Sequence, residues 1–449
     1  MANSRKSRFN PASRLQERVA DALTPIVPRA SSLLLGLSGG VDSVVLLHLL
    51  VQLAPRFSWR LSALHVHHGI SPHADSWTEF CTLLCAKYAV PLQVERVDIA
   101  PLRAMGVEAA ARQLRHAALA RQPVDFIALA HHRDDQAETL LLQLLRGAGV
   151  RGASAMPMFK PGKAAPSLLR PLLNAERSEL EAYAREQGLH WVEDDSNADV
   201  SYPRNFLRRN VLPVLARRFP AYRATLARSA RHFAEAAELL DELAAQDASS
   251  AMDGDHLSVA ALRQSSSARG KNLLRYFLAA RGAPIPDSTR LEEMLRQLCE
   301  AGAAAQIRIT WQSWQLRCYR EHAYALPVTL PAADFVIVWQ GETEISLPAS
   351  HGVLQFERVF GQGLSLARLQ QGVVTIRSRQ GSESIQLDAA RPRQSLRNLL
   401  QQQGVPPWRR ELLPLVYCND ELILVPGVAI AAAYIAHADE PGLLAGFKY

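Results

Sequence analysis

The sequence is poor in cysteine: its 449 residues include five, and no two of them form a Cys-x-x-Cys pair. A small, odd number of cysteines argues against a disulfide framework and favours a reducing compartment. Cys81 and Cys85 form the one close pair, and their i,i+4 spacing places them on one face of a helix. We interpret both as small core residues, because zinc sites favour a different spacing.

The sequence also lacks a long hydrophobic run. Its most apolar segment, residues 422–436, is interrupted by Pro426 and Gly427 and is too short to span a membrane. The first 18 residues are basic and polar, without the apolar stretch of a secretory signal. We therefore expect a cytoplasmic protein that has no membrane partner.

The excess of positive charge is small. Lys and Arg number 50 against 43 acidic residues, which gives a formal net charge of +7. This balance favours a polyanionic partner, yet ribosomal and histone-like proteins are far more basic, so we expect nucleic acid as a substrate and not as a scaffold. A chain of this length exceeds one ordinary core, which predicts two or three domains.

Short apolar runs alternate with helical patterns between residues 31 and 200. We expect strands at 33–37, 62–66, 92–97 and 125–130, and helices at 41–53, 77–88, 107–120 and 134–145. This alternation predicts a Rossmann-like α/β fold, in which a doubly wound parallel sheet carries helices on both faces. Sheets of this kind bind ligands at the carboxyl ends of their strands.

The pattern changes after residue 221. Ala, Leu, Arg and Glu recur at helical spacing up to residue 300, which predicts a helical domain. Prolines near 326–331 indicate a linker, and short alternating strands beyond it, at 335–339, 373–377 and 422–425, predict a small mixed α/β domain. The expected domains therefore span 1–221, 222–325 and 326–449.

A glycine-rich turn joins the first expected strand to its helix, and it consists of Ser38, Gly39, Gly40, Val41, Asp42 and Ser43. Glycines let the backbone approach a phosphate, which the free N–H groups at the start of the helix then bind. Asp42 is an acid placed where phosphate would repel it, which indicates a bound Mg²⁺. A Walker A loop would need a lysine that is absent here. A helix N-terminus capped by Ser38 would explain one glycine pair, but six residues in this order favour an ATP site.

The order Ser-Gly-Gly-x-Asp-Ser is the signature of the PP-loop ATP pyrophosphatases, and the chain resembles this superfamily. Within it, the chain is similar to the tRNA(Ile)-lysidine synthetases over most of its length. The segments that carry this similarity stand in the family's order, at 65–69, 130–139, 146–149, 169–172, 191–197, 202–205 and 405–411.

The resemblance implies a ligase that cleaves ATP between its α and β phosphates and forms a C–N bond. Such an enzyme adenylates the cytosine at the first anticodon position of a tRNA(Ile) with a CAU anticodon. The ε-amine of L-lysine then displaces AMP and gives lysidine. The second and third domains are, on this resemblance, expected to bind tRNA.

Asp135 and Glu138 are the acids best placed for catalysis, together with His131 and Asp42. The two acids are i,i+3 on the first turn of a helix, just beyond His131 and His132, which end the fourth strand. They could hold the lysine ammonium or share Mg²⁺ with Asp42, and their position at a strand end favours this over helix-terminal acids that complement the dipole. We keep that simpler interpretation for Asp134.

Two arginines complete the candidate catalytic set. Arg112 shares a helix face with Arg115, one turn after Glu108, which a surface ion pair would explain. The family's Glu-x-x-x-Arg-x-x-Arg stretch implies instead that Arg112 contacts phosphate or a developing oxyanion, and both explanations stay open. Arg204 clusters with Arg208 and Arg209, as active-site or phosphate-binding arginines do.

Three other functions fit the sequence less well. Residues 147–152 match the dinucleotide fingerprint Gly-x-Gly-x-x-Gly, but they follow a helix and not a strand, so we reject an NAD site. A PP-loop tRNA thiolase commonly uses a reactive Cys-x-x-Cys pair, which is absent. A tRNA-binding protein without catalysis would not need Asp42, Asp135 and Glu138 beside an intact phosphate loop. The oligomeric state is open, with a homodimer as one option.

Overall fold

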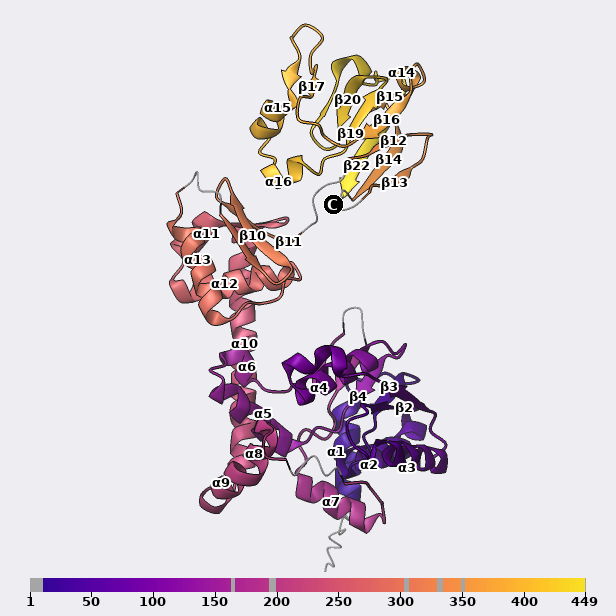
Figure 1. Ribbon diagram of the computed structural model, residues 1–449, viewed down its shortest axis with the longest axis vertical. Helices are drawn as coiled ribbons and strands as arrows, with labels where there is room; N and C mark the ends of the chain where they lie inside the picture. The colour runs from indigo at the N-terminus through magenta and orange to yellow at the C-terminus, as the bar shows by residue number, and fades with distance from the viewer. Residues whose placement is uncertain are drawn as a thin grey trace, which may run out of the picture. The chain divides into compact units, whose positions relative to one another are not determined.

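The computed structural model describes residues 11–162, 166–193, 199–302, 307–328, 334–348 and 352–448. The chain divides into two compact units, Met1–Leu240 and Asp241–Tyr449, and Figure 1 labels many of their helices and strands. Among the described residues, no helix combines the length and the apolar character needed to cross a membrane.

The first unit is built on a six-stranded sheet. Its strands run in the order β3-β2-β1-β4-β6-β5, and all neighbours are parallel except the last pair. The strands are β1 (Ser32–Gly36), β2 (Arg60–His67), β3 (Leu92–Arg96), β4 (Phe126–Ala128), β5 (Phe159–Lys160) and β6 (Ser167–Leu169). The chain starts in the middle of the sheet and builds outward in both directions, which confirms the predicted doubly wound fold.

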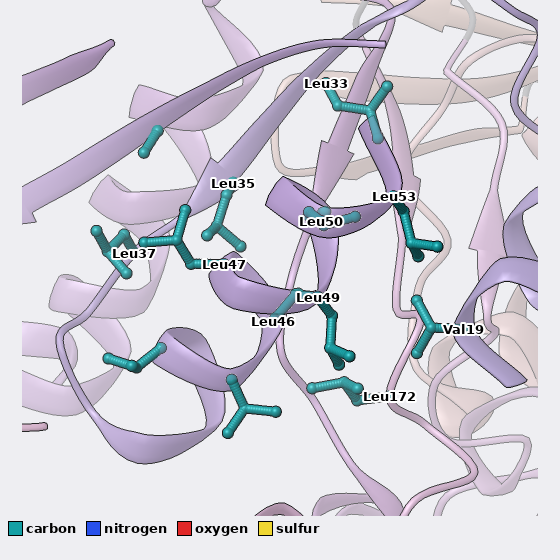
Figure 2. Packing of buried hydrophobic residues seen from close by; sticks show 14 of the residues in the cluster. Val19, Leu33, Leu35, Leu37, Leu46, Leu47, Leu49, Leu50, Leu53 and Leu172 are labelled. Carbon is teal, nitrogen blue, oxygen red and sulfur yellow. The ribbon is translucent and has the colours of Figure 1, made fainter. Parts of the chain in front are cut away.

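Helices cover both faces of this sheet, because successive side chains along each strand point to opposite faces and are apolar on both. Leu33 and Leu35 pack in a large core with one set of helices, whereas Leu34 lies in a smaller core with the opposite helix. The first set is α1 (Pro11–Leu23), α2 (Val41–Phe57), α3 (Ala74–Lys87) and α7 (Arg177–Glu186), and the opposite helix is α4 (Val107–Ala120). Figure 2 shows the leucines of α2 around those of β1. Cys81 and Cys85 are fully buried in the larger core, as predicted.

Helix α2 is apolar around most of its circumference, with Val44 to Leu47 and Leu49 to Leu50 all buried. A helix of this kind must be covered on several sides, and α1, α7 and the sheet cover it. The start of α2 is thus held rigidly beneath the glycine-rich turn.

Helix α5 (Arg133–Leu145) differs from α1 to α4 and α7 because it packs on later helices and not in the two cores of the sheet. Ala137 contacts Leu212 and Tyr222, while Leu140 contacts Ala153 and Ala230. The elements involved are α6 (Val150–Ala153), α8 (Pro203–Phe206), the π-helix η3 (Leu207–Val211), α9 (Leu212–Arg218) and α10 (Tyr222–Ala251). This packing brings residues near 204–223 to the beginning of α5, at the carboxyl end of β4.

The second unit begins with helices, as expected, but these pack on a sheet that the sequence did not reveal. The helices are α11 (Val259–Gln264), α12 (Ser267–Ala280) and α13 (Ser288–Glu300). The sheet has the order β7-β8-β11-β10-β9, with β7 (Met252–Asp253), β8 (His256–Ser258), β9 (Arg308–Trp311), β10 (Trp314–Tyr319) and β11 (His322–Pro327). Arg320 and Glu321, between β10 and β11, both have positive φ. Hairpin turns of this kind usually carry Asn or Gly, and their absence here hid the hairpin.

The rest of the second unit is a mixed α/β region, as predicted. Two antiparallel sheets, β12-β16-β19-β20-β21 and β13-β14-β22-β15, enclose one core. Their strands are β12 (Val336–Val338), β13 (Glu344–Ser346), β14 (Val353–Phe360), β15 (Leu364–Ser365), β16 (Val374–Arg377), β19 (Leu415–Cys418), β20 (Glu421–Val425), β21 (Ala429–Ile430) and β22 (Pro441–Lys448). The smaller elements are α14 (Leu366–Leu369), β17 (Ser384–Ile385), β18 (Gln394–Ser395), α15 (Leu396–Gln402) and α16 (Pro407–Arg410). The division between the two units falls inside α10, and the three predicted domain bounds stay a prediction.

Candidate active site

The turn between β1 and α2 is held by hydrogen bonds among its own residues. The Ser43 hydroxyl donates to the Gly40 carbonyl at 2.9 Å and lies 3.1 Å from the Ser38 hydroxyl, which accepts the Gly40 N–H at 3.4 Å. Gly40 precedes the first turn of α2, where Val41 and Asp42 lie. The two serines therefore shape the turn, and the first N–H groups of α2 remain to bind an anion.

Gly39 is required by both backbone and space. Its φ of +88° is one that other residues rarely adopt, and a Cβ there would lie 2.8 Å from the Val192 side chain. The Gly39 carbonyl accepts the Val192 N–H at 3.0 Å, so the segment after α7 packs directly on the turn. The second glycine is less constrained, because a Cβ on Gly40 would meet only the Ser38 hydroxyl, at 3.6 Å.

Asp42 points toward His132, which follows β4 and is the N-cap residue of α5. Their Oδ2 and Nε2 atoms are 3.6 Å apart, and the same nitrogen is 3.4 Å from Oδ2 of Asp135. Burial disfavours a charged ring, but the carboxylates of Asp134, Asp42 and Asp135 outweigh it and raise the pKa of His132 to about 10. The ring is 1% exposed and carries a positive charge at neutral pH.

Asp135 and Glu138 are both engaged by arginines. Arg204 donates from Nε to Glu138 at 2.7 Å and from Nη2 to Asp135 at 2.8 Å. Arg208 donates to both oxygens of Glu138, at 2.7 and 3.0 Å. Asp135 also accepts the backbone N–H of His132 at 2.9 Å, which fixes the start of α5. Glu138 is 1% exposed, so its charge is balanced almost wholly by the two guanidinium groups.

Basic groups dominate the surroundings of His131. Burial lowers the pKa of its ring to about 3, Asp135 opposes that shift, and Arg170, Arg204 and Arg112 reinforce it, so the ring is neutral. Arg170 is buried, donates to the Pro157 carbonyl, and has its own pKa lowered to about 10 by burial and then by Arg112. Arg112 hydrogen-bonds to none of the described residues. This excess of positive charge beside the glycine-rich turn suits a phosphate-bearing ligand.

Comparison with known proteins gives a consistent result along the chain. Residues 11–215 match the PP-loop domain family, 257–324 the TilS substrate binding domain and 374–445 the TilS substrate C-terminal domain. The chain is 46% identical over 435 residues to a tRNA(Ile)-lysidine synthase of Nitrosomonas europaea, covering 96% of this chain and 93% of that protein. The chain belongs to the tRNA(Ile)-lysidine synthase family.

A second member of the family, from an Azoarcus species, is 41% identical over 419 residues, covering 92% of this chain and 91% of that protein. Among solved structures, U34-tRNA thiolase NcsA from Methanococcus maripaludis resembles part of the chain. The identity is 17% and the TM-score 0.44, over 50% of this chain and 80% of that chain, and the likeness is too weak to bear on function. Membership of the tRNA(Ile)-lysidine synthase family confirms the predicted PP-loop domain and the predicted class, a ligase that forms a C–N bond.

The structure brings most of the predicted catalytic residues together. Asp42 and Asp135 both contact the His132 ring, and Asp135 and Glu138 share Arg204. The sequence predicts a catalytic role for His131 and none for His132. The alternation of residues along the strand does not show which of the two rings faces Asp42. Arg208 was named only within a basic cluster, and its spacing of four from Arg204 was the available signal.

Three further predictions concern the glycine-rich stretch after α5, the segment at 191–197 and Asp134. Gly147 has a φ of +70° and follows α5, which confirms that the glycine-rich stretch begins with a helix-terminal turn. Of the family segment at 191–197, residues 194–197 lie outside the described residues. Asp134, expected to be an ordinary helix-terminal acid, has partners on two other helices.

Proposed function

We propose that this member of the tRNA(Ile)-lysidine synthase family adenylates the cytosine at the first anticodon position of a tRNA(Ile) with a CAU anticodon. The ε-amine of L-lysine then displaces AMP and leaves lysidine. The observation that supports this most directly is the grouping of Asp42, the Asp135–Glu138 pair and their arginines around one PP-loop turn. Location in the cytoplasm and the oligomeric state stay predictions from the sequence.

Two kinds of group in the site suit the negatively charged phosphates of ATP. The N–H groups at the start of α2 and the guanidinium of Arg112 suit the triphosphate and the charge that develops when pyrophosphate leaves. Cytosine has one ring carbonyl, and its oxygen is the atom that an adenylyl group would activate for replacement by an amine. A neutral His131 with a pKa of about 3 is too weak a base to deprotonate the lysine ammonium at neutral pH, so its proposed role is to contact substrate.

A magnesium ion fits beside Asp42. Oδ1 of Asp42 is buried and accepts no hydrogen bond from the described residues, while Oδ2 faces His132. No group of three or more acidic, histidine or cysteine side chains is gathered to hold a metal within the described part of the chain. Mg²⁺ commonly takes one or two carboxylates together with phosphate oxygens and water. Asp42 would supply the protein ligand, and the ion would offset charge on the phosphates.

Recognition of the lysine ammonium by Asp135 and Glu138 stays part of the proposal, with one requirement. Both carboxylates are held by Arg204 and Arg208, so an ammonium can bind only if a guanidinium withdraws. An exchange of one cation for another keeps the buried carboxylates balanced in both states, whereas removal of an arginine alone would leave two carboxylates with one cation.

The decisive assay follows pyrophosphate and AMP release from ATP with tRNA(Ile) in the presence and absence of L-lysine. We expect one pyrophosphate per enzyme without lysine and continuous release of both products with it. The matched control is the same tRNA with uridine in place of the cytidine at the first anticodon position, which should support neither. Release that continues without lysine would refute the synthetase assignment.

A tRNA thiolase is the alternative nearest in chemistry, and the cysteine nearest the loop argues against it. Cys81 packs near Gly39, with its sulfur 3.6 Å from Nδ1 of His65. It is fully buried, and burial raises the pKa of its thiol to about 12, with a smaller contribution from Cys85. A thiol of this kind is protonated at neutral pH and is a poor nucleophile.

A further inference from the structure

A chain of polar contacts leads from the first turn of α10 to the PP-loop turn. Arg223 donates from Nε to Oδ1 of Asp134, and the other oxygen of Asp134 accepts the backbone N–H of Arg177 at 3.1 Å. That second oxygen lies 3.6 Å from Nδ1 of His132. On the far side of the ring, Nε2 of His132 lies 3.6 Å from Asp42. Four side chains from three helices and a strand end are therefore connected in series.

The geometry leaves the Asp134 carboxylate little freedom. One oxygen is held by a guanidinium from α10 and the other by the first N–H of α7, so rotation about the Cβ–Cγ bond would break both contacts. The Arg223 guanidinium is itself placed over the ring of Tyr222 at 4.7 Å, and Tyr222 is buried against Ala137 and Leu212. The Arg223 end of the series and the Asp134 carboxylate are thus both held in place.

This series is separate from the arginines that hold Asp135 and Glu138. Arg204 and Arg208 contact those two acids, whereas Arg223 contacts Asp134. The two sets meet at His132, whose ring lies 3.4 Å from Asp135 and is 1% exposed. An acid that merely complements the helix dipole would not need partners on two other helices.

We propose that Arg223 is a positioning residue for the adenylation step. Through Asp134 it fixes the ring of His132, and that ring holds the carboxylate of Asp42 in the orientation that the ATP site requires. This inference rests on the proposed function in that it takes adenylation as the step affected. A displacement of the order of 1 Å at a reacting group costs about 100-fold in rate. A substitution of Arg223 should therefore change the rate measurably, although the side chains of Asp134 and His132 lie between it and Asp42.

The test compares Arg223→Met, Arg223→Lys and the control Arg185→Met in the full chain. Arg185 is an exposed arginine of α7 whose side chain contacts Glu181 at 3.5 Å. In single-turnover pyrophosphate release, we expect Arg223→Met to slow the rate constant by about 10- to 100-fold, with an unchanged amplitude and an unchanged KM for ATP. Arg223→Lys should recover part of the rate, and Arg185→Met should match the wild type.

A purely structural role would have a different signature, because partial unfolding lowers the amplitude and leaves the rate constant of the remaining enzyme unchanged. That result would overturn the inference. A second measurement does not depend on catalysis: in protein carrying ¹⁵N-labelled histidine, Arg223→Met should shift or broaden the ring resonance of His132, identified by its loss in His132→Gln. An unmoved resonance would overturn the inference, whereas a wild type that releases no pyrophosphate refutes the proposed function alone.

Discussion

Replacement of Glu138 by alanine should destabilise the first unit strongly. Glu138 is 1% exposed, and its partners Arg204 and Arg208 have side chains that are 20% and 30% exposed. Its loss removes three hydrogen bonds and leaves, among the described residues, Asp135 as the acid that the two guanidinium groups share. Removing one partner from a buried ion pair costs about 3–5 kcal/mol, since the remaining charge is neither solvated nor paired.

The expected loss of stability can be measured as a fall in melting temperature. For a unit of 240 residues, 1 kcal/mol corresponds to roughly 2–4 °C, so Glu138→Ala should lower the transition of the first unit by roughly 6–20 °C in scanning calorimetry. The matched control is Glu181→Ala on α7. Glu181 also contacts two arginines, Arg177 and Arg185, but their side chains are 41% and 69% exposed.

Exposed pairs at i,i+4 spacing contribute about 0.3–0.5 kcal/mol each, so loss of both pairs in Glu181→Ala should lower the transition by only about 1–4 °C. Combining Glu138→Ala with Arg208→Met should restore part of the loss, because one of the two unpaired guanidinium groups is then gone. Equal shifts for Glu138→Ala and Glu181→Ala would show that burial does not set the strength of the cluster, and would refute the reasoning.

Three further predictions concern the turn and its surroundings. Gly39→Ala should weaken ATP binding roughly tenfold or more, measured by calorimetric titration, because it adds backbone strain and a contact with Val192, whereas Gly40→Ala should change affinity by less than about threefold; equal effects would contradict the assigned conformation. Asp42→Asn should reduce pyrophosphate release by roughly 100-fold or more and raise the Mg²⁺ concentration for half-maximal rate, with tRNA binding retained in a filter assay; an unchanged Mg²⁺ dependence would exclude a ligand role. His116 has its pKa lowered from 6.5 to about 4, first by burial and then by nearby arginines. Between those values the unfolded chain binds a proton that the folded chain does not, so stability falls as the pH drops from 6.5 to 4, at up to about 1.4 kcal/mol per pH unit. His116→Phe should flatten the melting temperature over this window, and an unaltered slope would show that another group titrates.

Much of the catalytic fold could be predicted because its signals are local. The apolar runs of β1 to β4 and the glycines at 39 and 40 each occupy a few consecutive residues, and the structure places them within a few residues of the expected bounds. The hairpin between β10 and β11 was missed because Arg320 and Glu321 take left-handed conformations without the usual Asn or Gly. Its strands carry too few alternating residues to compensate for the missing turn signal.

Only part of the candidate site could be predicted, because its contacts join residues that lie far apart in the sequence. The i,i+3 spacing of Asp135 and Glu138 is visible in the sequence, but their partners Arg204 and Arg208 lie about seventy residues further on. These contacts arise because α5 packs on α9 and α10, and nothing in the periodicity of α5 distinguishes that packing from an ordinary place on the sheet. The arginine partners of a buried acid are therefore fixed by tertiary structure, which no local pattern records.

The contact between Gly39 and Val192 determines how short a nucleotide-binding fragment of the protein can be. The backbone of the phosphate loop is closed by a residue that enters about 150 positions later, through a hydrogen bond and a side chain that fills the space above the glycine. A strand–loop–helix fragment covering residues 31–57 would hold the signature residues without the segment that fixes their shape. Grafting the loop into another scaffold should for the same reason fail unless the segment around Val192 is carried with it, and the smallest portable nucleotide-binding module of this chain extends past that residue.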